Sequence, residues 1–316
     1  MSGFLIRRTL QALVVVIGVT IITFLLLHLL PGGPARAILG PRATPVQIKA
    51  FVQQYGLDKP LVIQYVTWLG QLLHGNLGFS YKLNQSVDSL LAQRLPKTLI
   101  LTGIATLVAL IVAIPLGVLQ AVRRNRPVDY ALTGLSFIFY ATPTFFLGII
   151  LVLVFAVLIH ALPAEAPQGT SALGVLSQPA ALVLPVATLA LTTIAAFSRY
   201  MRSSTLDALL QDYVRTARAK GLSERTVLFV HVLRNALIPI ATLLGLSLPG
   251  ILSGSLITES VFNYPGMGLL FWNAAQTSDF PILLGVTVIV GVATVLGSLL
   301  ADITYAVLDP RVRYVH

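Results

Sequence analysis

Six long stretches of the chain contain no Asp, Glu, Lys or Arg, and they limit its fold more than any other feature. Each has between 20 and 33 residues, and about 20 apolar residues suffice to cross a bilayer as a helix. Every backbone amide in lipid needs a partner, and these continuous apolar runs lack the alternation of barrel strands, so transmembrane helices are expected. The stretches are residues 10–30, 98–122, 130–162, 179–198, 236–258 and 280–301.

The composition agrees with a membrane protein. Of the 316 residues, 56% are hydrophobic and only 10% are charged, whereas about 25% of the residues in soluble proteins are charged. The chain has no cysteine, which excludes disulfides, thiolate catalysis and cysteine-based zinc or iron–sulfur sites. Its net charge of +10 needs an explanation, either nucleic acid, an anionic membrane surface or membrane topology.

The distribution of basic residues favours topology. If the amino terminus is cytoplasmic, 14 basic residues lie in the inner segments and 7 lie outside, all of them between residues 36 and 97. A block of that length is translocated regardless of its charge. We therefore expect an all-α polytopic membrane protein with six transmembrane helices and both termini in the cytoplasm, and no nucleic-acid partner.

This topology divides the chain into three parts. Residues 1–30 form a cytoplasmic amino terminus and the first transmembrane helix, which we interpret as retained because no small-residue cleavage site follows it. Residues 31–97 form an extracytoplasmic insert, whose amphipathic pieces at 46–55 and 61–73 predict short helices. Residues 98–316 form a five-helix core that includes the cytoplasmic segment 199–235.

The segment 199–235 has a helical pattern outside the membrane stretches. Gly221 interrupts this pattern as a helix end would, and Ser223 with Glu224 offers a cap for a second helix. The spacing alone fits an ordinary solvated helical hairpin equally well. The apolar positions at helical spacing are Leu206, Leu209, Leu210, Tyr213 and Ala217.

The same segment resembles the cytoplasmic coupling loop of ABC importer permeases of the dipeptide, oligopeptide and nickel group. The resemblance rests on YVRTARAKGLS at 213–223 and HVLRNALIP at 231–239, in which Ala217, Gly221 and Leu233 fit the general loop motif. Further similar elements occur at 30–35, 55–60, 64–65, 75–80, 259–268, 279–281 and 309–314. Gly33 and Asn76 stand where acids are common in that group, which argues against a role for those carboxylates here.

The resemblance implies a type I ABC importer permease fold in the bacterial cytoplasmic membrane. The chain would be the first of two permeases, forming the pathway for di- and oligopeptides as a heterodimer with the second. Two ATPase subunits, or one two-domain ATPase, and an extracytoplasmic binding protein would complete the transporter. A nickel-complex or glutathione importer of the same family stays open as an alternative.

The nucleotide chemistry is expected on the partners. The sequence has no phosphate-binding loop of the GxxxxGK[ST] form, so ATP and Mg²⁺ would bind the ATPase subunits. This chain is therefore expected to be a transport subunit without catalytic, cofactor or metal sites of its own.

Two groups of residues are expected to carry the function. Gly221 would permit a tight turn at the ATPase, with small Ala217 in close contact and Leu222 as apolar anchor. Apolar residues 262–267 would dip back at the outer mouth as a gate or a contact for the binding protein. The expected coupling residues are Ala217, Lys220, Gly221, Leu222, Ser223, Glu224 and Arg225, and the outer-loop residues are Phe262, Asn263, Tyr264, Pro265 and Gly266.

Two other classes of membrane protein fit the sequence less well. A self-sufficient secondary carrier or channel would need inverted repeats or an ion site within the membrane, and an intramembrane enzyme would need a nucleophile and base or metal ligands at that depth. The six stretches contain no acid, Lys or Arg, and His28 and His160 fall at outer helix ends, where an interfacial position is expected. The sequence therefore favours the importer subunit over both.

Overall fold

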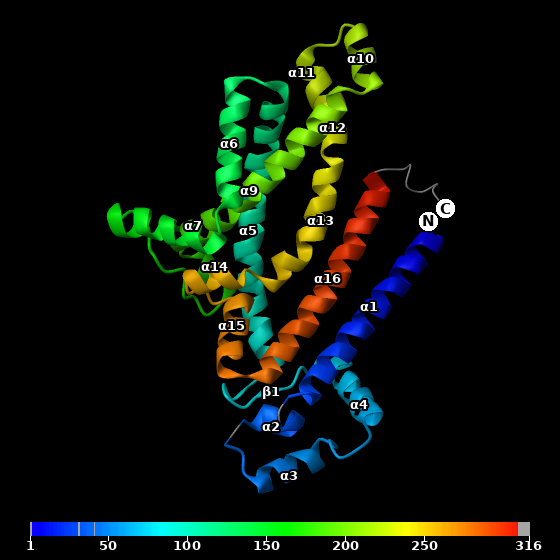
Figure 1. Ribbon diagram of the computed structural model, residues 1–316, viewed down its shortest axis with the longest axis vertical. Coiled ribbons are helices and arrows are strands. Elements are labelled where there is room, and N and C mark those ends of the chain that lie inside the picture. The colour runs from blue at the N-terminus through cyan, green and yellow to red at the C-terminus, as the bar shows by residue number, and fades with distance from the viewer. Residues whose placement is uncertain (1, 31, 41, 309–316) are drawn as a thin grey trace. The chain divides into compact units, whose positions relative to one another are not determined.

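A computed structural model describes residues 2–30, 32–40 and 42–308, and only the backbone of residues 2–6 and 301–308 (Figure 1). The described chain is mostly helical and divides into two compact units. The first unit comprises Met1–Leu99, Gln168–Val175 and Pro249–Leu296, and the second comprises Ile100–Pro167, Leu176–Leu248 and the chain from Gly297 on. The terminal motif at 309–314 lies outside the described residues.

The first unit contains the amino-terminal helix and the insert. The pieces expected at 46–55 and 61–73 are helices, and Thr44 caps the first of them by accepting a hydrogen bond from Gln47 N–H. A two-stranded antiparallel hairpin, which the sequence did not indicate, pairs Phe79 with Ser86. The elements are α1 (Ser2–His28), α2 (Gly33–Leu39), α3 (Pro45–Gln54), α4 (Leu61–Leu73), β1 (Phe79–Ser80), β2 (Gln85–Ser86), α14 (Leu256–Val261) and α15 (Met267–Thr277).

The second unit contains the segment that resembles a coupling loop. Its short helices α10 and α11 lie at the ends of α9 and α12 in Figure 1. Its elements are α6 (Pro127–Ala141), α7 (Thr144–Leu151), the π-helix η1 (Val152–Leu158), α9 (Pro179–Leu209), α10 (Asp212–Ala219), α11 (Glu224–Thr226), the π-helix η2 (Val227–Val232) and α12 (Leu233–Ala236). Helices α5 (Val87–Val122), α13 (Ile238–Ser253), α16 (Phe280–Leu308) and the short α8 (Ala172–Leu176) contribute residues to both units.

Five of the described helical segments are long and apolar enough to cross a membrane, and a sixth span exists if one bent pair is counted as a single crossing. The bent pair corrects the expectation for residues 130–162. Instead of one long helix, α6 ends at Ala141 and the following helix begins at Thr144, with a bend of 104° between them. Pro143 immediately precedes the second helix, and a proline disfavours helical geometry in the residue before it.

The helix that contains the second charge-free stretch begins before that stretch. Helix α5 starts at Val87 rather than at residue 98, so the last three turns assigned to the insert belong to this helix. The expected boundary followed the charges of Arg94 and Lys97, but a helix does not end where a charge appears. Asp88 in the first turn instead favours a helix start at this point, because it complements the helix dipole.

Candidate functional site

The turn at Gly221 ends α10 as the sequence predicts. Gly221 has a φ of +76°, and its N–H donates to Arg218 O at 2.9 Å while Leu222 N–H donates to Ala217 O at 3.3 Å. These two bonds form a Schellman motif, which needs a left-handed residue at this position. Ser223 then caps α11, its Oγ accepting a hydrogen bond from Thr226 N–H at 3.2 Å.

The buried face of this segment differs from the expected one. The pattern from Leu206 to Ala217 is not one helix, because α9 ends at Leu209 and α10 starts at Asp212. Leu210 is consequently exposed, and Val214 is fully buried in its place. Ala217 packs in the same cluster of the chain itself, so its side chain faces the chain's own core, and its expected contact with the ATPase stays a prediction.

The residues from Lys220 to Arg225 are all exposed. Arg218, in the last turn of α10, donates two hydrogen bonds to Glu224, from Nε to Oε1 at 2.8 Å and from Nη2 to Oε2 at 3.0 Å. The bidentate bond raises the pKa of the Arg218 guanidinium above its ordinary value. The loop between α10 and α11 is therefore closed on itself by a charge pair, and Leu222 projects from it with 39% of its surface exposed.

An ion pair that sequence reasoning missed holds α9, the helix leading into this segment. Arg202 of α9 donates from Nε and Nη2 to the two carboxylate oxygens of Asp129 in α6, each at 2.8 Å. Asn125 N–H at 3.0 Å and the Thr133 hydroxyl at 3.3 Å also donate to Asp129, which is buried. The sequence signal was Asp129 directly after an arginine-rich turn, at the start of an apolar run.

The loop at 262–266 points into the protein rather than outward. Phe262, Tyr264, Pro265 and Gly266 are buried, and only Asn263 is exposed. The Tyr264 hydroxyl donates to Lys97 O in α5. Burial raises the pKa of this phenol, and the nearby Glu259 raises it further. The Tyr264 side chain therefore packs inside this chain, and the role of residues 262–266 as an outer gate or a binding-protein contact stays a prediction.

Glu259, one residue past the fifth apolar stretch, is completely buried next to this loop. Its Oε1 accepts a hydrogen bond from the Thr98 hydroxyl at 3.1 Å and its Oε2 accepts one from Leu269 N–H at 3.0 Å. Thr98 Oγ1 in turn accepts a bond from Met267 N–H at 2.8 Å. This carboxylate thus connects α5, α14 and α15, a role that sequence reasoning missed.

Glycines leave room for that carboxylate. A Cβ at Gly254 would lie 2.4 Å from Glu259 Oε1, and one at Gly266 would lie 2.5 Å from Oε2. Any other residue at these positions would collide with the carboxylate. The signal in the sequence was an acid flanked by Gly254, Gly266 and Gly268 directly after an apolar run.

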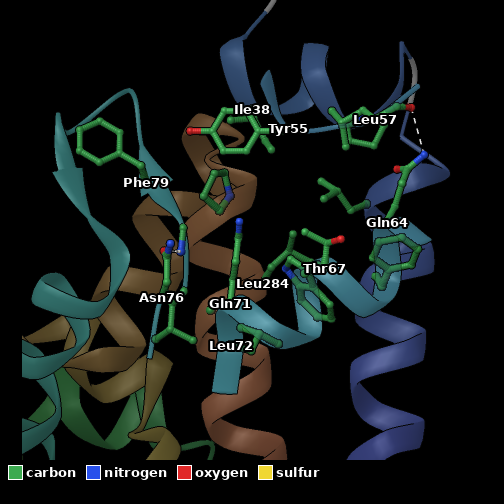
Figure 2. Close-up of a pocket in the computed structure, with 18 of the residues that line it drawn as sticks. Ile38, Tyr55, Leu57, Gln64, Thr67, Gln71, Leu72, Asn76, Phe79 and Leu284 are labelled. Carbon is green, nitrogen blue, oxygen red and sulfur yellow. Dashed lines mark hydrogen bonds between the residues drawn. The ribbon is translucent and has the colours of Figure 1, made fainter. Parts of the chain in front are cut away.

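A cavity of about 320 Å³ lies within the first unit (Figure 2). Its walls come from the end of α1, from α2 to α4, from the loop around β1 and from the first turns of α16. Figure 2 shows Gln71 of α4 reaching into it. Among the described residues that line it, none is Asp, Glu, Lys or Arg, so its surface is neutral and largely aromatic or aliphatic.

His28 and Gln64 connect the walls of this cavity. The Oε1 of Gln64 lies 2.9 Å from His28 Nε2, while the Nε2 of Gln64 donates to Leu57 O and Lys59 O at 3.0 and 2.6 Å. His28 therefore has a structural partner at the end of α1. In the part of the chain that is described, no three His, Cys, Asp or Glu residues are grouped so that they could hold a metal ion.

Comparison with known proteins identifies related sequences along the whole chain. A family model described as "Binding-protein-dependent transport system inner membrane component" matches residues 113–314, and one for the amino-terminal part of such components matches residues 1–102. The oligopeptide transport system permease protein AppB of Bacillus subtilis is 40% identical, over 99% of this chain and 100% of its own length. OppB of Haemophilus influenzae is 37% identical over the same shares.

A solved structure shares the fold. It is the MetNI methionine ABC transporter in an inward-facing conformation, one chain of which matches with a TM-score of 0.54. The match covers 70% of this chain and 96% of that one at 17% sequence identity. At this identity the comparison shows the fold alone, which is that of an ABC importer permease.

The Asp129–Arg202 pair gives a first prediction. Asp129→Asn should lower the free energy of unfolding in detergent by about 1.5–3 kcal/mol, the usual worth of hydrogen bonds to a charged group. The matched control is Asp212→Asn, whose pair with Arg215 at 3.6 Å is almost fully solvent-exposed and should contribute about 0–1 kcal/mol. Equal effects of the two substitutions in chemical denaturation would contradict this account.

Glu259 gives a second prediction. Glu259→Ala leaves Leu269 N–H and the Thr98 hydroxyl without this acceptor. We therefore expect the free energy of unfolding to fall by about 1.5–3 kcal/mol. Asp58→Ala, an exposed acid of the same unit, serves as the control and should stay within about 0.5 kcal/mol of the parent. The measurement is chemical denaturation of both variants and the parent protein. A Glu259→Ala protein as stable as the control would refute the anchoring role.

Proposed function

We infer the function of this chain from its family: it belongs to the inner membrane components of binding-protein-dependent transport systems. It is accordingly a multi-pass protein of the bacterial cytoplasmic membrane and the permease component of an ABC transporter. We propose that its cargo is di- or oligopeptides. The observation that carries this proposal is the full-length similarity to permeases named for oligopeptide transport.

The partners follow from the same proposal. A binding protein outside the membrane would deliver the peptide, and a second permease would complete the pathway. ATP and Mg²⁺ would bind two ATPase subunits, or one two-domain ATPase, on the cytoplasmic side, where both termini of this chain would also lie. The chain itself would bind no cofactor and catalyse no reaction, acting only as the moving wall of the pathway.

We propose that the exposed residues from Lys220 to Arg225 contact the ATPase. The loop is suited to this role in three ways: Gly221 fixes its turn, the Arg218–Glu224 pair closes it, and Leu222 offers an exposed apolar side chain for a groove. Val214 and Ala217 on the opposite face pack in a cluster with Met201 of α9 and Val232 of η2. A push on the loop would therefore pass to both helices that carry it, since the cluster is closely packed.

Transport by the assembled complex tests the cargo. Vesicles containing both permeases and the ATPase should accumulate labelled di- to oligopeptides only with ATP and the cognate binding protein present. Nickel-complex and glutathione uptake under the same conditions serve as comparisons. Accumulation of either of these in preference to peptides would overturn the peptide assignment while leaving the family intact.

Substitution of Gly221 tests the coupling role. A valine at φ +76° carries left-handed strain of about 1–2 kcal/mol, but a Cβ at this position meets no atom within 4 Å, so the fold should survive. Gly221→Val should therefore assemble normally yet lower ATP-driven uptake by about fivefold or more, the factor that 1 kcal/mol represents.

Gly221→Asn is the matched control, because asparagine tolerates the left-handed region. It should retain most of the uptake at equal expression. The coupling role is wrong if the valine variant transports at the parent rate, or if both variants lose uptake to the same degree.

A further inference from the structure

Helix α4 turns several large apolar side chains outward, unlike a helix at a water-exposed surface. Its polar side chains Gln64, Thr67 and Gln71 line the cavity (Figure 2), and it contains no Asp, Glu, Lys or Arg. A surface helix in water turns such residues outward and its apolar residues inward. The large apolar residues exposed on α4 are instead Leu61, Val62, Ile63, Val66 and Leu73, with 48–80% of each exposed.

The contacts of α4 place it at the depth of a membrane span. Tyr65 packs against α1, its hydroxyl lying 2.9 Å from Thr20 Oγ1. The ring of Phe24 in α1 also contacts α4, its centroid lying 5.4 Å from that of Tyr65 and 5.7 Å from that of Trp68. Thr20 lies eight residues before the end of the span Arg7–His28. At 1.5 Å per residue this is about 12 Å inside that end of the helix.

Helix α1 exposes apolar side chains along the same turns. Ile17, Ile21 and Leu25 have 40–44% of their surfaces exposed, as expected where a span meets lipid. Exposed apolar side chains therefore occur on both helices at one depth. Tyr65 and Trp68 also belong to the residue types enriched at the boundary between lipid and water.

Helix α4 has the length and the hydrogen bonding for this environment. Thirteen residues span about 20 Å, too short for a bilayer core of about 30 Å, so the helix must enter and leave on one side. Several backbone groups at its ends are paired, with Gln64 N–H donating to Pro60 O and Asn76 N–H to Gln71 O. Its polar side chains line the cavity, and those of Gln64 and Thr67 are hydrogen-bonded within the chain, which lowers the cost of placing the helix in lipid.

We propose that α4 is embedded in the membrane leaflet in which α1 ends, with Leu61, Val62, Ile63, Val66 and Leu73 in contact with lipid. The insert at 31–97 is then not wholly extramembrane, and α4 forms a lipid-facing wall of the cavity. The occupant of this face is the bilayer rather than a partner protein. The depth of the Tyr65–Thr20 contact and the absence of charge along the whole helix support that choice.

Spin labels on single cysteines test the proposal, and the chain has no native cysteine to interfere. Val62→Cys and Val66→Cys are labelled with a nitroxide in the complete transporter, reconstituted in phosphatidylcholine vesicles with the cysteines of its other subunits replaced. Collision rates with oxygen, which concentrates in lipid, and with a water-soluble nickel chelate are then compared. Val14→Cys on α1 is the lipid reference, and Val46→Cys on α3, 78% exposed in the same insert, is the water reference.

Labels at 62 and 66 should resemble the label at 14 more than the label at 46, with oxygen collisions several-fold more frequent than at 46 and chelate collisions several-fold rarer. Chelate access equal to that at 46 would place α4 in water and overturn the proposal. Shielding from both reagents would place a partner protein on this face. A loss of oxygen access when the binding protein is added would identify a docking surface, and these last two results also contradict the proposal.

Discussion

The structure depends on one constraint, which is that backbone and side-chain polar groups need partners wherever water is absent. The long apolar stretches meet it as helices, because a helix pairs its own amides. The same constraint explains the two buried acids. Asp129 accepts four hydrogen bonds, two of them from Arg202, and Glu259 accepts hydrogen bonds from Thr98 and Leu269. Each carboxyl group therefore joins helices that lipid alone would not order.

These acids lie where the proposed function needs rigidity. The Asp129 pair fixes α9 against α6, and α9 ends next to the loop that we assign to the ATPase. Glu259 fixes the turn between α14 and α15 against the start of α5. Closely packed elements transmit strain. Under the proposed function, both acids would therefore support transmission between the ATPase and the pathway.

The sequence was sufficient for features that depend on local chemistry. Charge-free length predicted the spans, Pro179 and Phe280 mark the starts of α9 and α16, and Gly221 predicted its turn. Features set by packing were not predictable. An apolar run does not indicate the direction of its helix axis, so the bend after Ala141 was not predictable. Aromatic residues at 262–264 suggested an outward contact, whereas the structure buries Tyr264 against α5.

Cross-linking within the assembled transporter tests the central claim, that the loop after α10 meets the ATPase. Leu222→Cys should capture an ATPase subunit through a short bifunctional reagent, in a yield that changes between nucleotide-free and ATP-bound complexes. Asn263→Cys, which is also exposed but lies on the loop before α15, should capture none. A Leu222→Cys protein that assembles and transports, yet links to the ATPase no better than Asn263→Cys, would contradict the account.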